Sequence, residues 1–254
     1  MFKQNKIMSV LALSGVLAMS TLTACGGGTD VIVGPAKPAE PVAPPKPVAS
    51  VITVDFNAGI DGWSADVADF TAETRPVDVA AAWKDLPAPL TGKGYYLIST
   101  NKSDDVMTFV KRQVSGFVPG AKYAVTFAMR YATDAGTGCM GVGGSRGESM
   151  WMVVAASADE PKVVKQANDE LRLNLERGNQ AESGRQGKVI GVQGGEGLGC
   201  SGGKWATQER KSDEAVELQA DKDGKFWIVL GTDSGFESTN ALSLQGATIN
   251  VKPL

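Results

Sequence analysis

The sequence contains no histidine among its 254 residues. Serine and cysteine hydrolases of the usual kind need a base that titrates near neutral pH, and imidazole is the usual supplier. Any catalysis by this chain would therefore depend on carboxylates, lysine, tyrosine or a hard metal ion. Glycosidases work with two carboxylates, so an enzyme is not excluded. No catalytic motif is present, and we regard a protein without enzymatic activity as the better interpretation.

Long apolar runs are scarce as well. The clearest is an uncharged, mostly apolar stretch from Ile7 to about Met19, which follows Lys3 and Lys6. It is shorter than the roughly 20 residues that span a membrane, and a basic start before an apolar run is typical of a secretory signal. The next residues, Leu22-Thr23-Ala24-Cys25, resemble the lipobox of bacterial lipoprotein precursors. That resemblance implies cleavage before the cysteine and a lipid attached to it.

These features divide the chain into a signal peptide at 1–24, a lipidated tether at 25–50 and a domain at 51–254. The tether starts with glycines and carries six prolines between Pro35 and Pro47, which favour an extended spacer of about 3 Å per residue. Gly26 follows Cys25 in place of aspartate, the usual inner-membrane retention signal in enteric-type bacteria. We therefore expect a cell-envelope protein anchored in the outer membrane. An ordinary signal peptide with a chance cysteine is the alternative.

Positive charge is also in short supply. The formal net charge is −3, and removal of Lys3 and Lys6 with the signal peptide lowers it to −5. A mildly acidic chain carries no basic stripe of the kind that nucleic-acid binding needs. We therefore expect no nucleic-acid partner, and the lipid anchor makes the membrane the expected contact instead.

Only two cysteines, Cys139 and Cys200, remain besides Cys25. A pair of cysteines in an exported protein is typical of one disulfide, because the compartment beyond the inner membrane is oxidising. Closing a loop of about 60 residues would stabilise the fold by roughly 4 kcal/mol in the chain-entropy model. A metal site is the weaker alternative, since two thiols without histidine cannot supply the usual four ligands of a structural zinc.

From Val51 onward, short apolar or alternating runs are separated by Gly, Asn, Asp and Pro. We predict strands near residues 51–56, 95–99, 106–114, 123–130, 150–156, 171–175, 189–192, 216–220, 226–230 and 242–251. The turn Asp221-Lys222-Asp223-Gly224 predicts a hairpin between two of them. A helix over Pro161 to Arg177 is the competing interpretation, and 162–169 stays undecided. About ten short strands without a βαβ rhythm predict one all-β domain, a jelly-roll-type sandwich.

Two short stretches carry a second resemblance. In Asp55 to Trp63, a strand ending in an acid and an aromatic runs into a Gly-Trp turn. In Phe117 to Phe127, a Pro-Gly turn leads into an alternating strand. Both stretches resemble carbohydrate-binding modules with a galactose-binding-like jelly roll. The resemblance implies the fold more than the ligand, because one fold hosts many functions.

The glycine-rich loops 136–147 and 194–203 each contain one of the two paired cysteines. If they are bridged, Arg146, Glu148 and Trp205 come together at one rim, where an aromatic ring with charged neighbours would suit a sugar. Structural loops held by a disulfide are the alternative. Trp83 is a second candidate for an exposed ring. The other tryptophans, which we expect to be buried, are Trp63, Trp151 and Trp227.

Four acidic residues, Asp104, Asp105, Asp233 and Glu237, lie beside strand ends in turn-like sequence. Oxygen-rich loops of this kind suit Ca²⁺, which takes six to eight oxygen ligands. A structural calcium ion is therefore the candidate cofactor, and capping of turns by Asp side chains is the alternative.

Taken together, these patterns favour a lipid-anchored envelope protein whose β-sandwich recognises a glycan or an envelope protein without catalysis. Two alternatives remain open. One is a polysaccharide-active enzyme that uses paired carboxylates. The other is a purely structural component of the envelope.

Overall fold

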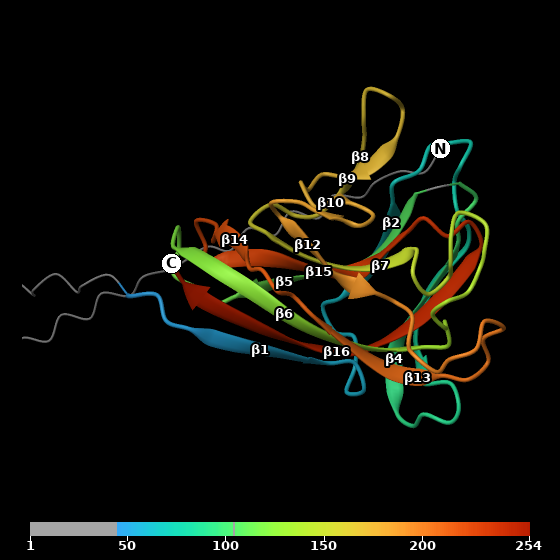
Figure 1. Cartoon of the computed structure of the whole chain (residues 1–254). Coiled ribbons are helices and arrows are strands. Elements are labelled where there is room, and N and C mark those ends of the chain that lie inside the picture. The colour runs from blue at the N-terminus through green and yellow to red at the C-terminus, as the bar shows by residue number, and fades with distance from the viewer. Residues whose placement is uncertain (1–44, 104) are drawn as a thin grey trace, which may run out of the picture. The chain divides into compact units, whose positions relative to one another are not determined.

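The structure is a computed structural model that describes residues 45–103 and 105–254. In that part of the chain every regular element is a β-strand, and the strands form two antiparallel sheets that face each other across a core (Figure 1). The predicted all-β sandwich is confirmed. Cys25 and Asp104 lie outside the described residues. None of the described residues forms a helix long and apolar enough to cross a membrane.

The larger sheet has seven strands and is built around a long strand near the end of the chain. One side of that strand pairs with two shorter strands in succession, and the other side pairs with one long strand. The strands in order are β13 (Ala206–Lys211), β6 (Lys122–Thr133), β16 (Thr239–Pro253), β4 (Lys93–Thr100) and β3 (Val77–Asp85), with β1 (Ser50–Asp55) beside β16 and β14 (Val216–Gln219) beside β6.

The smaller sheet has five strands, and its central strand pairs over its whole length with one neighbour. The strands in order are β12 (Gly187–Val192), β7 (Met150–Ser157), β15 (Lys225–Ser234), β5 (Val106–Ser115) and β2 (Ser64–Ala68). Two hairpins of two or three residues per strand lie apart from both sheets: β8 (Val163–Lys165) with β9 (Leu171–Leu173), and β10 (Gly178–Asn179) with β11 (Glu182–Ser183).

The main core lies between the two sheets. Phe127, Met129 and Tyr131 of β6 point inward at every second position and are buried there, as the alternation in the sequence predicted. Leu230 of β15 meets them from the smaller sheet, whereas its neighbour Val229 faces the opposite side. The period of two therefore gives the smaller sheet a second apolar face that must also be covered.

The segment 158–187, which contains β8 to β11, covers that second face (Figure 1). Its Leu173 and Leu175 are buried against Phe109 and Val229 of the smaller sheet. A β-bridge between Phe70 and residue 171 also ties the segment to the chain after β2. The helix considered for 161–177 is wrong, because the alternating leucines form short extended pieces instead.

The turn at Asp221 to Gly224 has the expected local chemistry but does not make a hairpin. Oδ1 of Asp221 accepts hydrogen bonds from the backbone N–H groups of Asp223 at 2.9 Å and Lys225 at 2.8 Å. The strand before the turn, β14, pairs with β6 in the larger sheet, while β15 after it belongs to the smaller sheet. The prediction was wrong because turn chemistry is local and does not decide which sheet the next strand joins.

Three strands of five residues or more, β2, β3 and β13, were not predicted from the sequence. The most consequential is β3, which lies at the edge of the larger sheet and has all nine residues exposed. Its Ala80-Ala81-Ala82 run carries no alternation, because neither of its faces is buried. Trp83, the second candidate for an exposed ring, lies on this strand.

Candidate functional site

Trp83 lies near the end of the edge strand β3, and 42 % of its surface is exposed. Its indole N–H donates a hydrogen bond to the carbonyl oxygen of Phe56 at 2.7 Å. Phe56 is fully buried and makes edge-on ring contacts with Trp63 and Tyr95. An exposed aromatic ring is thus fixed directly to the main core.

Polar groups surround this ring. The ammonium nitrogen of Lys93 lies 5.0 Å from the centroid of the Trp83 ring and 2.8 Å from Oδ1 of Asp85. The side-chain oxygen of Asn57 accepts a hydrogen bond from the backbone N–H of Lys93 at 2.8 Å. We call Trp83, Asn57, Asp85 and Lys93 the Trp83 platform. It combines a stacking surface with hydrogen-bond donors and acceptors in solvent.

The loop before β4 has to pass close to Asn57 to complete the platform. Gly92 adopts φ +91°, and a Cβ at this position would lie 2.7 Å from Oδ1 of Asn57. The carbonyl of Gly92 also accepts a hydrogen bond from the N–H of Leu86 at 2.9 Å, which closes the loop. Glycine is needed here because other residues rarely adopt this backbone conformation and would collide with the amide.

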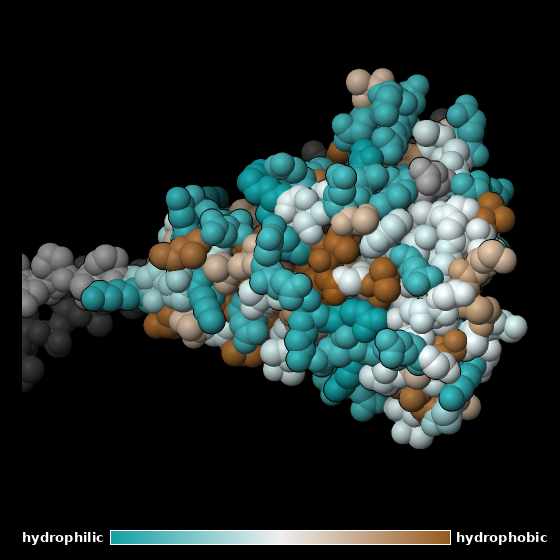
Figure 2. All heavy atoms as spheres, in the orientation of Figure 1, coloured by the Kyte–Doolittle hydropathy of each residue, from teal (hydrophilic) through white to brown (hydrophobic). Residues whose placement is uncertain are grey.

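Other exposed apolar side chains are scattered. On β3 they are Val77 and Val79, which are 37 % and 46 % exposed. Val79 lines a hollow of about 180 Å³ between β3 and β2, with Ala65 on the opposite side. In the view of Figure 2 the apolar surface forms separate small patches among polar residues. Single exposed apolar residues of this kind are normal, and the indole of Trp83 differs from the valines of β3 in being held by a hydrogen bond.

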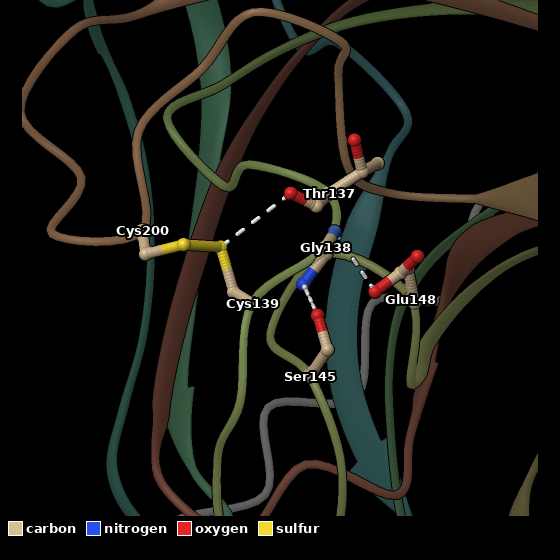
Figure 3. Close-up of a disulfide and its surroundings, with 7 residues drawn as sticks. Thr137, Gly138, Cys139, Ser145, Glu148 and Cys200 are labelled. Atoms are coloured by element: carbon tan, nitrogen blue, oxygen red, sulfur yellow. Dashed lines mark hydrogen bonds between the residues drawn. A yellow bond between two sulfur atoms is a disulfide. The ribbon is translucent and has the colours of Figure 1, made fainter.

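The expected disulfide between Cys139 and Cys200 is present (Figure 3). Their Cα atoms are 5.5 Å apart, and Gly136 and Gly195 form a β-bridge between the two loops. The glycine-rich loops therefore lie side by side, as the sequence suggested.

The charged groups at this rim already have partners within the protein. Arg146 forms an ion pair with Asp134 at 2.5 Å, and Glu148 accepts a hydrogen bond from the N–H of Gly138 at 3.1 Å (Figure 3). Trp205 is half-buried. Arg146 and Glu148 thus stabilise the loops, and the alternative interpretation of structural, disulfide-held loops gains support.

Three carboxylates, of Asp69, Asp105 and Asp233, converge beneath the segment 158–187, with ligand oxygens within 4.8 Å of one another. They come from three neighbouring strands, at the end of β2, the start of β5 and within β15. Two of the predicted calcium ligands are in this group, which we call the acid cluster. Asp69 was missed because β2 was not predicted, and Glu237 is not a member.

Two arginines of the covering segment lie against the acid cluster. Arg177 is buried, forms an ion pair with Asp233 at 2.5 Å and another with Asp69. Nε of Arg172 lies 3.6 Å from Oδ1 of Asp69, and its Nη1 lies 3.9 Å from Oδ2 of Asp105. Buried charges are stable only when they are paired, so these contacts hold the segment on the sheet.

Burial raises the pKa of Asp105 to about 9, and the charge of Asp233 and a hydrogen bond to it act in the same direction. Asp105 therefore keeps its proton at neutral pH. The three carboxylates lie close enough together to hold a metal ion. Arg172 and Arg177 already balance two of the three possible carboxylate charges. A hard cation such as Ca²⁺ would therefore have to replace the proton on Asp105.

The acid cluster is also the place where paired carboxylates occur, which the enzyme interpretation requires. The side chains of Asp69 and Asp233 are fully buried, and that of Asp105 is 18 % exposed. A substrate would have to displace the segment 158–187 to reach them. This arrangement suits a structural role better than acid–base catalysis, which needs contact with the reacting atoms.

Two tryptophans expected in the core are only half-buried. Trp151 and Trp227 alternate with inward residues such as Met152 and Phe226, so they lie on the outer face of the smaller sheet. The prediction failed because apolar neighbours in a strand need not share a face. Trp63, in contrast, is buried as expected.

No protein-family model matches this chain, and no curated protein matches it. Solved structures with a similar fold include a putative sugar-binding protein from Bacteroides thetaiotaomicron, with 9 % identity over 78 % of this chain and 92 % of that one, and a TM-score of 0.37. A family 11 carbohydrate-binding module of a Clostridium thermocellum cellulosomal cellulase has 11 % identity, covers 81 % and 95 %, and scores 0.35. An adhesin domain of Lys-gingipain from Porphyromonas gingivalis has 14 % identity, covers 80 % and 98 %, and scores 0.34. This similarity concerns the fold alone.

Proposed function

We propose that this chain is a lipid-anchored protein of the cell envelope whose β-sandwich binds glycan, without catalysis, at the Trp83 platform. The supporting observation is an indole that is 42 % exposed and yet fixed by its hydrogen bond to Phe56. Sugars stack an apolar face on such rings and direct their hydroxyl groups to polar neighbours. A ring that is already ordered loses little conformational freedom when a ligand binds.

Lys93 and Asp85 provide the polar contacts of the platform. In the free protein the ammonium of Lys93 lies over the ring and pairs with Asp85. A stacked sugar would displace the ammonium toward the ring edge, where it can donate to a hydroxyl group while Asp85 accepts from another. The side chain of Lys93 is 40 % exposed and that of Asp85 is 83 % exposed, so rearranging this ion pair costs little free energy.

The anchor rests on the lipobox at Cys25, with the proline-rich tether holding the domain away from the membrane. Replacing Cys25 with alanine should leave the chain without lipid, either released into the soluble fraction or retained uncut. Mass spectrometry of the wild-type protein should find lipid on the N-terminal cysteine, and Gly26 after it predicts the outer-membrane fraction. A soluble, lipid-free wild-type protein would contradict the anchor.

Glycan binding is tested by affinity electrophoresis through neutral and acidic polysaccharides, followed by calorimetry with the polymer that retards the protein. Trp83→Ala should weaken binding about thirtyfold, the loss expected when a central aromatic residue is removed. Trp205→Ala is the matched control, because this half-buried ring lies at the disulfide-linked loops. If Trp205→Ala loses binding while Trp83→Ala keeps it, the site lies at the loop rim. Release of sugar products by the wild-type protein would favour the enzyme alternative.

A further inference from the structure

Phe56 and Asn57, which hold Trp83 and Lys93, begin a turn that ends at Trp63. This turn also borders a second hollow, of about 200 Å³. Thr53 and Asp55 from β1 lie on one side of this hollow. Asp61 from the turn and Arg112 from β5 also line it. The hollow is therefore lined by several polar side chains, and it lies next to Phe56, whose backbone carbonyl accepts the hydrogen bond from the indole of Trp83.

Arg112 occupies an unusual position on its strand. It lies between Val110 and Val114 on the face of β5 that contacts the main core, and yet it is only half-buried. No hydrogen bond or ion pair joins its guanidinium to any residue in the described part of the chain. A guanidinium carries five N–H donors, and no nitrogen of Arg112 is among the buried side-chain atoms without a partner, so these donors reach solvent. Its donors are thus available to a ligand in the hollow.

Gly62 allows Arg112 to lie against the turn. This glycine has φ +75°, and a Cβ built there would lie 3.4 Å from Nε of Arg112. This close contact keeps the Arg112 side chain beside the turn, and Asp61 lines the same hollow. The Gly-Trp turn noted in the sequence therefore lies against a cation without a partner among the described residues, and it supports the core through Trp63.

We propose that this hollow is a second sugar subsite, which binds the hydroxyl groups of a neutral glycan chain whose neighbouring unit stacks on Trp83. The inference rests on the proposed function and extends it to the class of ligand. Hydroxyl groups both donate and accept, and Arg112 can donate to them while Asp55 and Asp61 accept. Oδ1 of Asp55 is used by the N–H of Asn57, so Oδ2 remains for the ligand.

Two features link the hollow to the platform and define the ligand. Phe56 and Asn57, which hold Trp83 and Lys93, lie between two hollow-lining residues, Asp55 and Ala58. A chain of linked sugars can therefore contact both regions, whereas a single sugar contacts one. Two carboxylates against one guanidinium leave the hollow with net negative charge, which disfavours uronic acids and sulfated sugars.

The test uses the full chain in detergent and four polymers: a β-galactan, a β-mannan, a xylan and polygalacturonate. Calorimetry then measures the monosaccharide and tetrasaccharide of the best neutral polymer. Arg112→Gln should weaken tetrasaccharide binding about tenfold, as expected for lost hydrogen bonds to a charged group, and leave the monosaccharide unchanged. Arg185→Gln is the control, because Arg185 is exposed in the segment 158–187 and does not line the hollow.

Trp83→Ala separates this inference from the proposed function. If Trp83→Ala loses binding while Arg112→Gln binds the tetrasaccharide like the wild type, the second subsite is wrong and the platform stands. If the wild type binds none of the four polymers, both are wrong. Tighter binding of polygalacturonate than of the neutral polymers overturns the ligand class. Asp61→Asn, an exposed substitution, should also weaken tetrasaccharide binding and serves if Arg112→Gln fails to fold.

Discussion

The Trp83 platform and the acid cluster use similar residues in opposite environments. At the platform, Lys93 and Asp85 form an ion pair with side chains that are 40 % and 83 % exposed. In the acid cluster, Arg177 and Asp233 form one with side chains that are 2 % and 0 % exposed. The exposed pair can separate to meet a ligand, whereas the buried pair cannot separate without leaving a charge out of water.

This difference assigns the two regions to different tasks. Exposed ion pairs contribute little to stability, while breaking a buried pair by removing one partner is strongly destabilising. We therefore expect substitutions in the acid cluster to change the free energy of unfolding, and substitutions at the platform to change binding.

The largest effect on stability should come from Arg177→Ala. It leaves Asp69 and Asp233 buried without their main cation and should cost about 3–5 kcal/mol. Chemical denaturation measures the loss. The matched control is Arg185→Ala, whose ion pair with Glu176 is exposed, and which should cost at most about 1 kcal/mol. Equal effects of the two substitutions would contradict the structural role of the acid cluster.

Removal of the disulfide should have the next largest effect. Replacing Cys139 and Cys200 together with serine removes the constraint on the unfolded chain and should cost about 2–4 kcal/mol. Glycan binding should stay within twofold of the wild type, since the Trp83 platform draws on neither loop. A loss of binding in a variant that remains folded by circular dichroism would move the site to the loop rim.

The raised pKa of Asp105 predicts a pH dependence. Between roughly pH 4 and 9 the folded chain holds a proton on Asp105 that the unfolded chain has released. Stability should therefore fall as the pH rises through this interval, because the folded chain binds a proton that the unfolded chain does not. Asp105→Asn should flatten that part of the curve in denaturation measured across pH.

Adding Ca²⁺ tests whether a metal ion can replace the proton on Asp105. Glu237→Gln, at a predicted calcium ligand outside the acid cluster, should keep the pH dependence of the wild type. A rise in the melting temperature of the wild type with Ca²⁺, lost in Asp105→Asn and kept in Glu237→Gln, would show that a metal ion replaces the proton. An unchanged melting temperature leaves the proton as the stabilising species.

Lys93→Ala should have the smallest effect. It removes one hydrogen-bond donor and the ion pair with Asp85, but leaves the ring of Trp83 in place. Because the pair is exposed, stability should change by less than about 1 kcal/mol. Binding measured by calorimetry should weaken only a few-fold, or strengthen slightly if displacement of the ammonium limits stacking. A loss as large as that of Trp83→Ala would mean that the charge dominates recognition.

Local patterns in the sequence were sufficient for part of this account. The alternation in β6 predicted a strand with one buried face, and Asp105 and Asp233 were recognised as candidate ligands. Features that depend on pairing between distant segments were missed. The edge strand β3 lacks a buried face and therefore any period, and Asp69 joins the acid cluster only through the pairing of β2 with β5. The partners of Arg146 likewise depend on the folded loops.

The most direct test of the central claim compares binding and stability in one variant, Trp83→Ala. We expect a glycan affinity about thirtyfold weaker, with a stability loss near 1 kcal/mol from the hydrogen bond to Phe56. Calorimetry and chemical denaturation on the same preparation measure both quantities. Wild-type affinity in a folded Trp83→Ala protein would contradict the claim that the exposed, core-anchored indole is the recognition site.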